Sequence, residues 1–154
     1  MKIIVVSDSH RRHKLLEDIR MANQDADVFI HCGDFESIDW LPEGWVAVHG
    51  NNDFYSDLPD ERVLTLDDIK ILVTHSHQYY YNSRLSDLKA KAKKLECRIV
   101  CFGHTHTTCL KEDDGTWLIN PGSLLYNRDG SPCGYVVVII EKGKIVSVEK
   151  KLIS

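Results

Sequence analysis

Five apolar segments of the sequence are each followed by side chains that can bind a metal ion. These side chains are Asp8 and His10, then Asp34, then Asn51, then His75, and finally His104 and His106. A single histidine at such a position is more often structural than a ligand, but seven donors after five successive segments indicate a shared site. In α/β sheets the ligand crevice lies beyond the carboxyl ends of the strands, so we expect these residues to converge.

The spacing of the donors favours the same interpretation. Asp8 and His10 lie two positions apart, as do His104 and His106. In an extended segment, residues i and i+2 face the same side, so each pair is predicted to contact one centre. Three donors directly follow a glycine, whose missing side chain lets the backbone turn sharply and approach a bound group closely. These glycines are Gly33, Gly50 and Gly103.

The chemistry of the donors indicates which metals they suit. Histidine nitrogens, aspartate oxygens and one asparagine oxygen, without a thiolate, are typical of Mn, Fe, Ni, Co or Zn in an open site rather than of a structural zinc site. Seven donors exceed what one ion needs, which predicts two divalent ions about 3.5–4 Å apart, bridged by a carboxylate. Asp34 stands alone in its cluster and is the expected bridge.

The first half of the chain has the pattern of a βαβ unit. Lys2–Val6 is a run of mostly β-branched apolar residues, typical of a strand covered on both faces. Apolar residues at near-helical spacing predict a helix over residues 14–23, and a second buried strand begins at Val28. The first two strands are therefore expected to be parallel neighbours joined by a right-handed crossover.

The second half of the chain has the pattern of three hairpins and one helix. Turns at Asp67-Asp68, Asp114-Gly115 and Lys142-Gly143 join pairs of apolar runs. An amphipathic helix is predicted over Ser83–Lys94. Its apolar stripe consists of Leu85, Leu88, Ala92 and Leu95. We therefore predict an α/β fold, a two-sheet mixed β-sandwich flanked by helices, in a single domain over residues 1–154.

Composition and charge narrow the classes of partner. Of 154 residues, 43% are hydrophobic and 27% are charged, which is ordinary for a globular protein. A net charge of −4 gives no overall basic field, so nucleic acid is not an expected partner. No apolar segment approaches the length of a membrane span, and the five cysteines include no C-x-x-C pair. We therefore expect a cytoplasmic protein with reduced thiols and no membrane partner.

The ordered motifs resemble those of a known enzyme family. They are Asp8-Ser9-His10, Gly33-Asp34, Gly50-Asn51-Asn52-Asp53, Thr74-His75-Ser76-His77 and Gly103-His104-Thr105-His106. In this order they resemble the successive motifs of the calcineurin-like metallophosphoesterases. The small size of the chain and the Asn-Pro-Gly-Ser segment at 120–123 are similar to the YfcE-type phosphodiesterase branch. The resemblance implies the same two-sheet sandwich.

The resemblance also implies how the donors divide between two ions. The first ion would be held by Asp8, His10, Asp34 and His106, and the second by Asp34, Asn51, His75 and His104. Two such ions, with manganese the first candidate, lower the pKa of a bridging water from about 15.7 toward about 7. The hydroxide would attack the phosphorus of a small phosphate ester in line, while the ions and Asn51 hold its non-bridging oxygens.

Three positions depart from the family pattern. Many members carry a histidine, placed to protonate the leaving oxygen, where this chain has Asn52. Since an amide cannot act as a general acid, we expect phosphodiesters with good leaving groups to be better substrates than phosphomonoesters. Arg11 and Ser76 replace frequent glycines, and Arg11 either reaches a substrate phosphate or is a solvated surface residue.

Other residues near the motifs have weaker assignments. His77 and Asp53 are candidates to orient ligands or contact substrate. His13 and His31 are interpreted as structural or exposed. Walls of a substrate pocket are expected from Tyr79, Tyr80 and Tyr81 and from the loop of residues 52–60.

A scaffold is the alternative from another functional class. The membrane-coat retromer contains a subunit of this fold that has lost catalysis and serves as a protein-interaction surface. A scaffold should show broken ligand positions, whereas all seven are present here. A nuclease is disfavoured by the acidic balance of charge.

Overall fold

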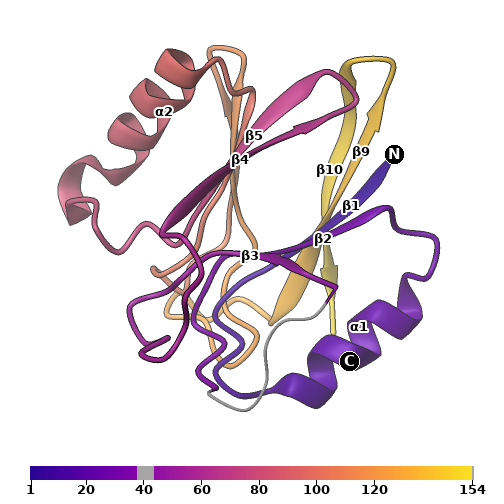
Figure 1. Cartoon of the computed structure of the whole chain (residues 1–154), viewed down its shortest axis with the longest axis vertical. Helices are drawn as coiled ribbons and strands as arrows, with labels where there is room; N and C mark the ends of the chain where they lie inside the picture. Colours follow the sequence, from indigo (N-terminus) through magenta and orange to yellow (C-terminus); the bar gives the residue numbers. More distant parts are fainter. Residues whose placement is uncertain (38–43, 154) are drawn as a thin grey trace.

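The apolar runs of the chain form two five-stranded sheets that pack face to face, with a helix on each outer side (Figure 1). The structure, a computed structural model, describes residues 1–37 and 44–153. The layers run helix, sheet, sheet, helix in a single α/β domain. This arrangement confirms the predicted two-sheet sandwich flanked by helices.

The first sheet has the strand order β10-β9-β1-β2-β3. Its strands are β1 (Lys2–Val6), β2 (Val28–His31), β3 (Val46–Ala47), β9 (Gly134–Glu141) and β10 (Lys144–Leu152). β1 pairs in parallel with β2, with Ile3 opposite Val28, and helix α1 (His13–Ala22) connects them. The predicted βαβ unit is confirmed, with the helix shifted by one residue toward the N-terminus.

The second sheet has the strand order β4-β5-β6-β8-β7. Its strands are β4 (Glu61–Leu66), β5 (Ile69–Thr74), β6 (Ile99–Cys101), β7 (Cys109–Asp113) and β8 (Thr116–Asn120). β6 pairs in parallel with both β5 and β8, while β4 and β7 run antiparallel at the two edges. The pairs β4–β5, β7–β8 and β9–β10 are the three predicted hairpins.

Three apolar layers hold the sandwich together. Between the sheets, one buried cluster includes Val5 and Ile30 of the first sheet and Ile71 of the second. On the outer faces, Leu16 of α1 packs against the first sheet and helix α2 (Arg84–Leu95) packs against the second. Central strands are covered on both faces, which explains their continuous apolar runs.

The predicted apolar stripe of α2 is partly wrong. Leu88 and Ala92 are buried as expected, but Leu85 is 39% exposed. Arg84 is buried instead, and its guanidinium donates to the backbone carbonyls of Ser76 and Tyr79 at 3.3 and 3.2 Å. The buried row therefore follows an i, i+4 spacing from residue 84, and a short 3₁₀ turn (Tyr81–Ser83) precedes the helix.

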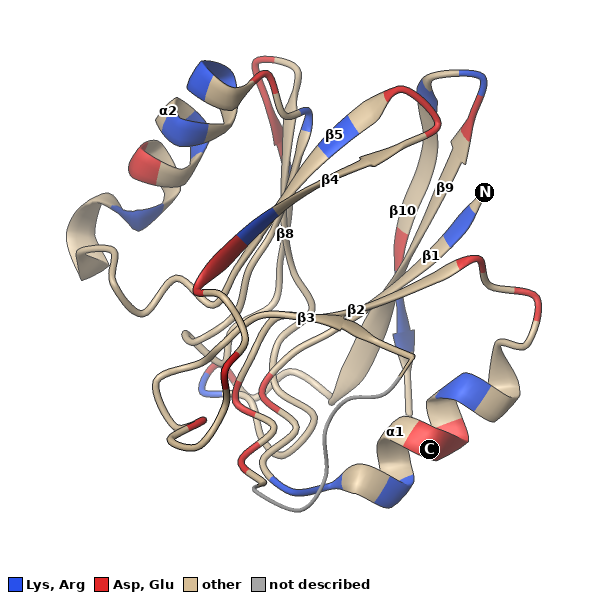
Figure 2. Cartoon of the chain, viewed as in Figure 1, with Lys and Arg blue, Asp and Glu red and all other residues tan. Residues whose placement is uncertain are grey.

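The carboxyl ends of five strands meet at one end of the sandwich. β1, β2 and β3 of the first sheet and β5 and β6 of the second lead into loops gathered at the lower end in Figure 1. Asp and Glu residues lie in these loops (Figure 2). Of the helices in the described residues, none has the length and apolar character needed to cross a membrane.

Candidate metal centre

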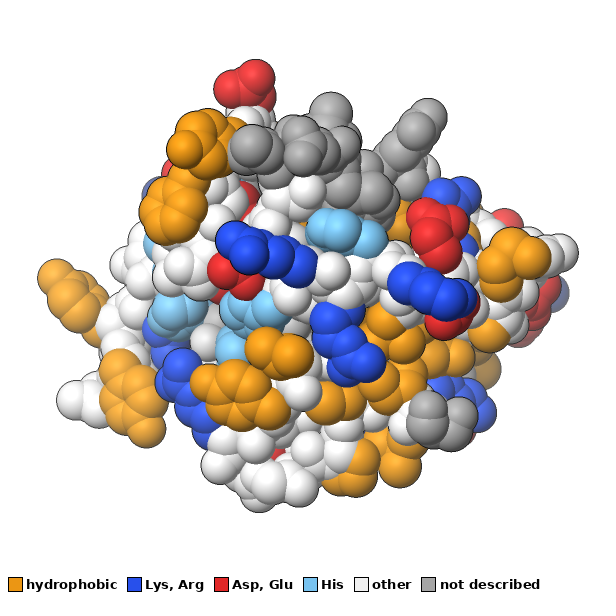
Figure 3. Space-filling view, turned by 90° about the horizontal axis from the view of Figure 1, so that it is seen from below, with side chains coloured by type: hydrophobic (Ala, Val, Ile, Leu, Met, Phe, Trp, Pro, Cys, Tyr) orange, Lys and Arg blue, Asp and Glu red, His pale blue; other side chains and the backbone are white. Residues whose placement is uncertain are grey.

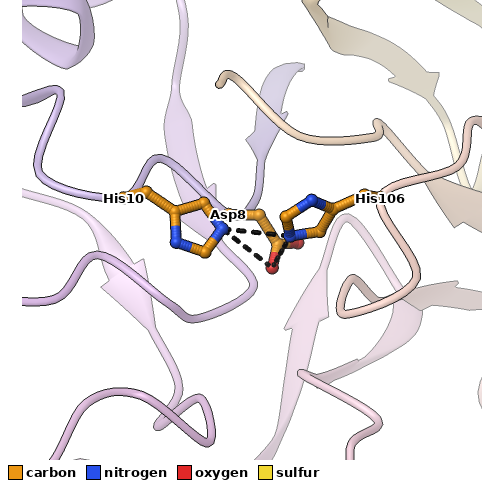
Figure 4. A group of neighbouring side chains, drawn as sticks. All are labelled: Asp8, His10 and His106. Carbon is orange, nitrogen blue, oxygen red and sulfur yellow. Dashed lines mark hydrogen bonds and ion pairs between the residues drawn. The ribbon is translucent and has the colours of Figure 1, made fainter. Parts of the chain in front are cut away.

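The Asp8 carboxylate lies in the middle of the converging loops (Figure 4). Its side chain is fully buried. Its Oδ1 atom lies 3.3 Å from His106 Nε2, 3.8 Å from His75 Nε2 and 3.9 Å from His10 Nε2. The Nε2 atoms of His10 and His106 are 3.0 Å apart. Three imidazoles from three different loops therefore point at one carboxylate oxygen.

The other predicted donors extend this cluster around His75. Its Nε2 atom lies 3.3 Å from Asp34 Oδ2 and 3.0 Å from Asn51 Oδ1. His104 Nδ1 lies 3.2 Å from the same Asn51 oxygen. All seven residues predicted from the sequence thus belong to one continuous group at five strand ends.

Two subsets of the cluster are compact enough to hold an ion each. They are Asp8, His10 and His106, and Asp8, Asp34 and His75, and within each subset the donor atoms lie within 4.8 Å of one another. The carboxylate common to both subsets is that of Asp8. The bridging position that the sequence assigned to Asp34 stays a prediction.

The backbone brings the paired donors together in a way that the spacing did not predict. Asp8 and His10 have φ angles of 51° and 44°, and His104 and His106 have φ angles of 72° and 54°. These left-handed residues are not an extended segment, so the same-face argument is wrong. Hydrogen bonds between loops impose the turns instead: the N–H groups of Asp8 and His10 donate to the carbonyls of Gly33 and Asp34, both at 3.0 Å.

The expected role of the glycines as points of close approach is confirmed. A Cβ atom on Gly103 would lie 2.0 Å from Ser7 Oγ and 2.7 Å from Asp8 Oδ2. A Cβ atom on Gly50 would lie 2.2 Å from Asp34 Oδ1. Gly103 and Gly50 are therefore required because the backbone passes against the carboxylates, since only a residue without Cβ fits there.

Hydrogen bonds fix the orientation of two imidazoles. His75 Nδ1 lies 2.8 Å from the Cys32 carbonyl oxygen and donates to it, which leaves the Nε2 lone pair directed at Asp34 and Asn51. His10 Nδ1 pairs with the Glu36 carboxylate, which leaves Nε2 directed at Asp8 and His106. Histidines that ligate metals usually donate their other ring N–H in this way.

Glu36 is a residue of the site that sequence reasoning missed. It lies on the loop after β2, two residues beyond Asp34, and its φ angle of 54° turns the side chain toward His10. The signal was an acidic residue close to a predicted ligand, but nothing in the spacing linked position 36 to position 10.

The residues present fit a divalent cation. Asp8 Oδ1 is buried and makes no hydrogen bond within the described part of the chain, although three imidazole nitrogens face it. A buried acceptor without a partner costs about 1–3 kcal/mol, and more when it is charged. The Nε2 atoms of His10 and His106 also face each other at 3.0 Å, so two nitrogen donors point at the same place. A cation at this point would satisfy both features with nitrogen and oxygen donors.

The pKa shifts of two carboxylates and one imidazole of the cluster suit metal binding at neutral pH, whereas the Asp34 and Asp8 carboxylates outweigh burial and raise the pKa of His75. Burial alone would raise the pKa of Asp34, but the nearby His75 and the amide donors of Asn52 lower it. Burial likewise opposes ionisation of Asp8, but His106 and His75 lower its pKa overall. Burial lowers the pKa of His104 to about 4. Ionised carboxylates and a neutral imidazole are the forms that ligate metals.

The sequence profile of the calcineurin-like phosphoesterase superfamily domain matches residues 1–143. The chain belongs to the calcineurin-like phosphoesterase superfamily. Phosphodiesterase MJ0936 of Methanocaldococcus jannaschii is 31% identical over 176 residues, which cover 98% of this chain and 95% of that protein.

Solved structures show the same calcineurin-like fold. A predicted phosphoesterase from Streptococcus pneumoniae TIGR4 matches with a TM-score of 0.87 and 32% identity, covering 97% of this chain and 87% of that one. Vps29 from Entamoeba histolytica, solved in complex with Zn²⁺, matches with a TM-score of 0.75 and 22% identity, covering 98% and 97% of the two chains. At this identity the second match shows the fold alone.

Asn52 and Asp53, the two residues that follow Asn51, hold the loops of the site together. The Asn52 backbone N–H and side-chain amide donate to Asp34 Oδ1 and Oδ2 at 2.9 and 3.0 Å. The buried Asp53 carboxylate accepts three backbone N–H groups, those of Asp34, Gly50 and Glu36, each at 2.8 Å. Asp53 thus ties the loop after β3 to the loop after β2.

The two residues that replace family glycines both adopt left-handed backbone conformations. Arg11 has a φ angle of 70° and Ser76 one of 78°, the region that favours glycine. Arg11 is exposed, and its Nε donates to the Glu36 carbonyl oxygen at 3.2 Å.

His77 is half-buried, and the centroid of its ring lies 5.5 Å from that of the His75 ring. Burial lowers the pKa of His77.

His31 is a buried structural residue beneath the site, which is one of the two alternatives that the sequence left open, the other being an exposed position. It is fully buried, and its Nδ1 accepts the Gly33 N–H at 3.0 Å. Its Nε2 therefore carries the proton and lies 2.9 Å from the Ser9 hydroxyl. Burial lowers the pKa of His31 to about 3, which keeps the ring neutral.

Replacing Glu36 tests whether it orients His10. Glu36→Ala is expected to weaken the affinity for Mn²⁺ by roughly 10–100-fold, because it removes the carboxylate that fixes the ring. Isothermal titration of the metal-free protein measures this. Glu61→Ala is the matched control, since Glu61 is also half-buried but contacts Lys91 and Tyr79. Equal Mn²⁺ affinity in both variants would contradict the assignment.

His31 should make the metal-free protein less stable in acid. The unfolded chain binds a proton at His31 below its ordinary pKa of 6.5, whereas the folded chain does so only near pH 3. Between these limits the contribution of His31 lowers the free energy of unfolding by about 1.4 kcal/mol per pH unit as the pH decreases. Urea unfolding of the wild type and His31→Asn should show this difference in slope between pH 6 and 4. Protonation of the His31 ring above pH 5, observed by NMR, would rule it out.

Proposed function

We propose that this calcineurin-like chain is a two-metal phosphoesterase that hydrolyses small phosphodiesters. The observation that carries the proposal is the buried Asp8 Oδ1 atom, which has three imidazoles around it and no hydrogen bond in the described residues. The relative named a phosphodiesterase, similar along almost the whole chain, supports the choice of diesters.

The family pattern assigns the seven donors to two ions, and the geometry supports such an assignment. Asp8, His10, Asp34 and His106 would hold the first ion, and Asp34, Asn51, His75 and His104 the second. When bound, the two ions, with manganese the first candidate, would supply Lewis-acid activation of water and of the phosphate oxygens. The compact subsets that share Asp8 are consistent with two adjacent ions.

Residues of the chain prepare the site for this chemistry. Cys32 and Glu36 hold His75 and His10 with their Nε2 lone pairs directed inward. Asn52 keeps Asp34 ionised and in place. Asn51 is exposed at the mouth, and its amide N–H₂ group can donate to a non-bridging phosphate oxygen.

The preference for diesters over monoesters rests on Asn52. Its side-chain amide donates to Asp34 Oδ2, and an amide carries no titratable proton that it could give to a leaving group. A good leaving group needs no protonation, whereas hydrolysis with a poor one is slower by on the order of 10²–10⁴-fold without a general acid.

The cysteines suit a cytoplasmic setting for this activity, because all five are free thiols.

Hydrolysis of bis(p-nitrophenyl) phosphate tests the proposed function. The protein with added Mn²⁺ should release p-nitrophenolate, and a chelator should abolish the release. Asp34→Asn should lower kcat/KM by at least about 100-fold, because it removes a ligand charge, while Glu61→Ala should not. A folded protein that binds Mn²⁺ but hydrolyses no phosphate ester would contradict the proposal and would instead support a non-catalytic protein-interaction scaffold of the same fold.

Asn52→His tests the basis of the diester preference. The imidazole should raise kcat/KM for diphenyl phosphate relative to bis(p-nitrophenyl) phosphate by about tenfold or more, because the poorer leaving group benefits from a general acid. Asn52→Ala is the control, since it also removes the side-chain bond to Asp34 but adds no acid. The same ratio of kcat/KM values in the two variants would refute this account of Asn52.

A further inference from the structure

Exposed aromatic side chains gather around the mouth of the candidate metal centre. Of the five exposed aromatic residues in the described part of the chain, Phe54, Tyr55 and Tyr126 lie on loops beside the candidate metal ligands, whereas Tyr80 and Tyr81 lie just before helix α2. The Tyr126 ring contacts the His106 ring edge-on, with 5.0 Å between centroids. Seen from this end, hydrophobic side chains lie beside histidines and Lys or Arg residues (Figure 3). The distribution therefore marks the rim of the site.

Two of these aromatic residues line a cavity beside the candidate metal centre. Phe54 and Tyr55 line a space of about 440 Å³ together with Asn52, Glu36 and Arg11. Asn52 binds Asp34, and Glu36 binds His10. A group bound in this cavity would therefore lie next to both halves of the metal cluster.

A rigid turn presents the two rings. Phe54 and Tyr55 are the central residues of a turn closed by the Ser56 N–H on the Asp53 carbonyl at 3.2 Å. The buried Asp53 carboxylate anchors that turn through three backbone N–H groups. The side chains are nevertheless 77% and 78% exposed. Turn corners favour Gly, Asn, Asp, Ser and Pro, so two aromatic residues are unusual there, and their exposed rings bury little apolar surface.

Arg11 adds a cation to the same cavity. Its Nε bonds to the Glu36 carbonyl oxygen, and the residue is exposed, so the guanidinium faces solvent at the cavity wall. The Glu36 carboxylate pairs with His10, and Arg11 donates to the Glu36 backbone carbonyl rather than to its carboxylate. Aromatic rings combined with a guanidinium suit a planar group attached to a phosphate.

We propose that this cavity binds the planar aromatic or heterocyclic ester group of the phosphodiester substrate, such as a nucleoside. The Phe54 and Tyr55 rings would pack against the plane, and Arg11 would face the phosphate oxygens. This inference rests on the proposed function and narrows its substrate class. A larger cavity of about 950 Å³ lies between α2 and β7 and is lined by Tyr81, but no hydrogen bond links its described lining residues to the predicted metal ligands, as Asn52 and Glu36 are linked to Asp34 and His10.

Equilibrium binding of two phosphate monoesters tests the inference without requiring turnover. The Mn²⁺-loaded protein should bind adenosine 5′-phosphate more tightly than ribose 5-phosphate, which lacks the planar ring. Phe54→Ala or Tyr55→Ala should weaken binding of the nucleotide by about tenfold and leave ribose 5-phosphate unchanged, in line with the usual contribution of stacking on one ring. Arg11→Ala should weaken both ligands. Tyr81→Ala, an equally exposed tyrosine at the other cavity, should change neither.

Equal affinity of the wild type for the two ligands would overturn the inference. It would also be overturned if Phe54→Ala, with unchanged Mn²⁺ stoichiometry, lost the same factor of affinity for both ligands. If Arg11→Ala binds both ligands as tightly as the wild type does, the role assigned to Arg11 is wrong. The outcomes for the cavity and for the proposed function can be told apart. Hydrolysis of aryl diesters without a preference for binding the nucleotide contradicts the cavity assignment alone. A nucleotide preference without any hydrolysis supports the cavity and contradicts the proposed activity.

Discussion

The buried Asp8 carboxylate sets the electrostatic problem that the surrounding loops solve. One of its oxygens accepts hydrogen bonds from the Ser7 hydroxyl at 2.6 Å and the His104 N–H at 3.0 Å. The other faces three imidazoles without a hydrogen bond in the described residues. A buried charge is costly unless it is paired. The fold therefore keeps an oxygen, with nitrogen donors around it, in a state that a cation would stabilise.

Maintaining that arrangement requires backbone conformations that are unfavourable in isolation. Asp8, Asp34 and His104 all have left-handed φ angles, each costing about 1–2 kcal/mol for a residue with a Cβ. Such residues persist where the surrounding structure over-determines them, and they concentrate at functional sites. Here the sandwich core fixes the strand ends, while Asp53 and His31 fix the loops through hydrogen bonds to backbone N–H groups and to Ser9. Core and site are thus mechanically linked.

Much of this could be predicted from the sequence, because strand ends and glycines follow simple rules. The apolar runs predicted both sheets and all three hairpins, and the donors after those runs predicted which side chains converge. The contacts of Glu36 with His10 and of Asn52 with Asp34 were not predictable, since they depend on how separate loops pack. The burial of Arg84 in place of Leu85 was missed for the same reason, because carbonyls of a preceding loop receive its guanidinium.

The number of metal ions bound per chain tests the central claim most directly. Titration of the metal-free protein with Mn²⁺ should reach two ions per chain, and His106→Ala and His75→Ala should each remove one of them, because these residues belong to different subsets of the cluster. A stoichiometry of one or zero in the folded wild type would contradict a two-metal centre. So would two ions retained in both variants.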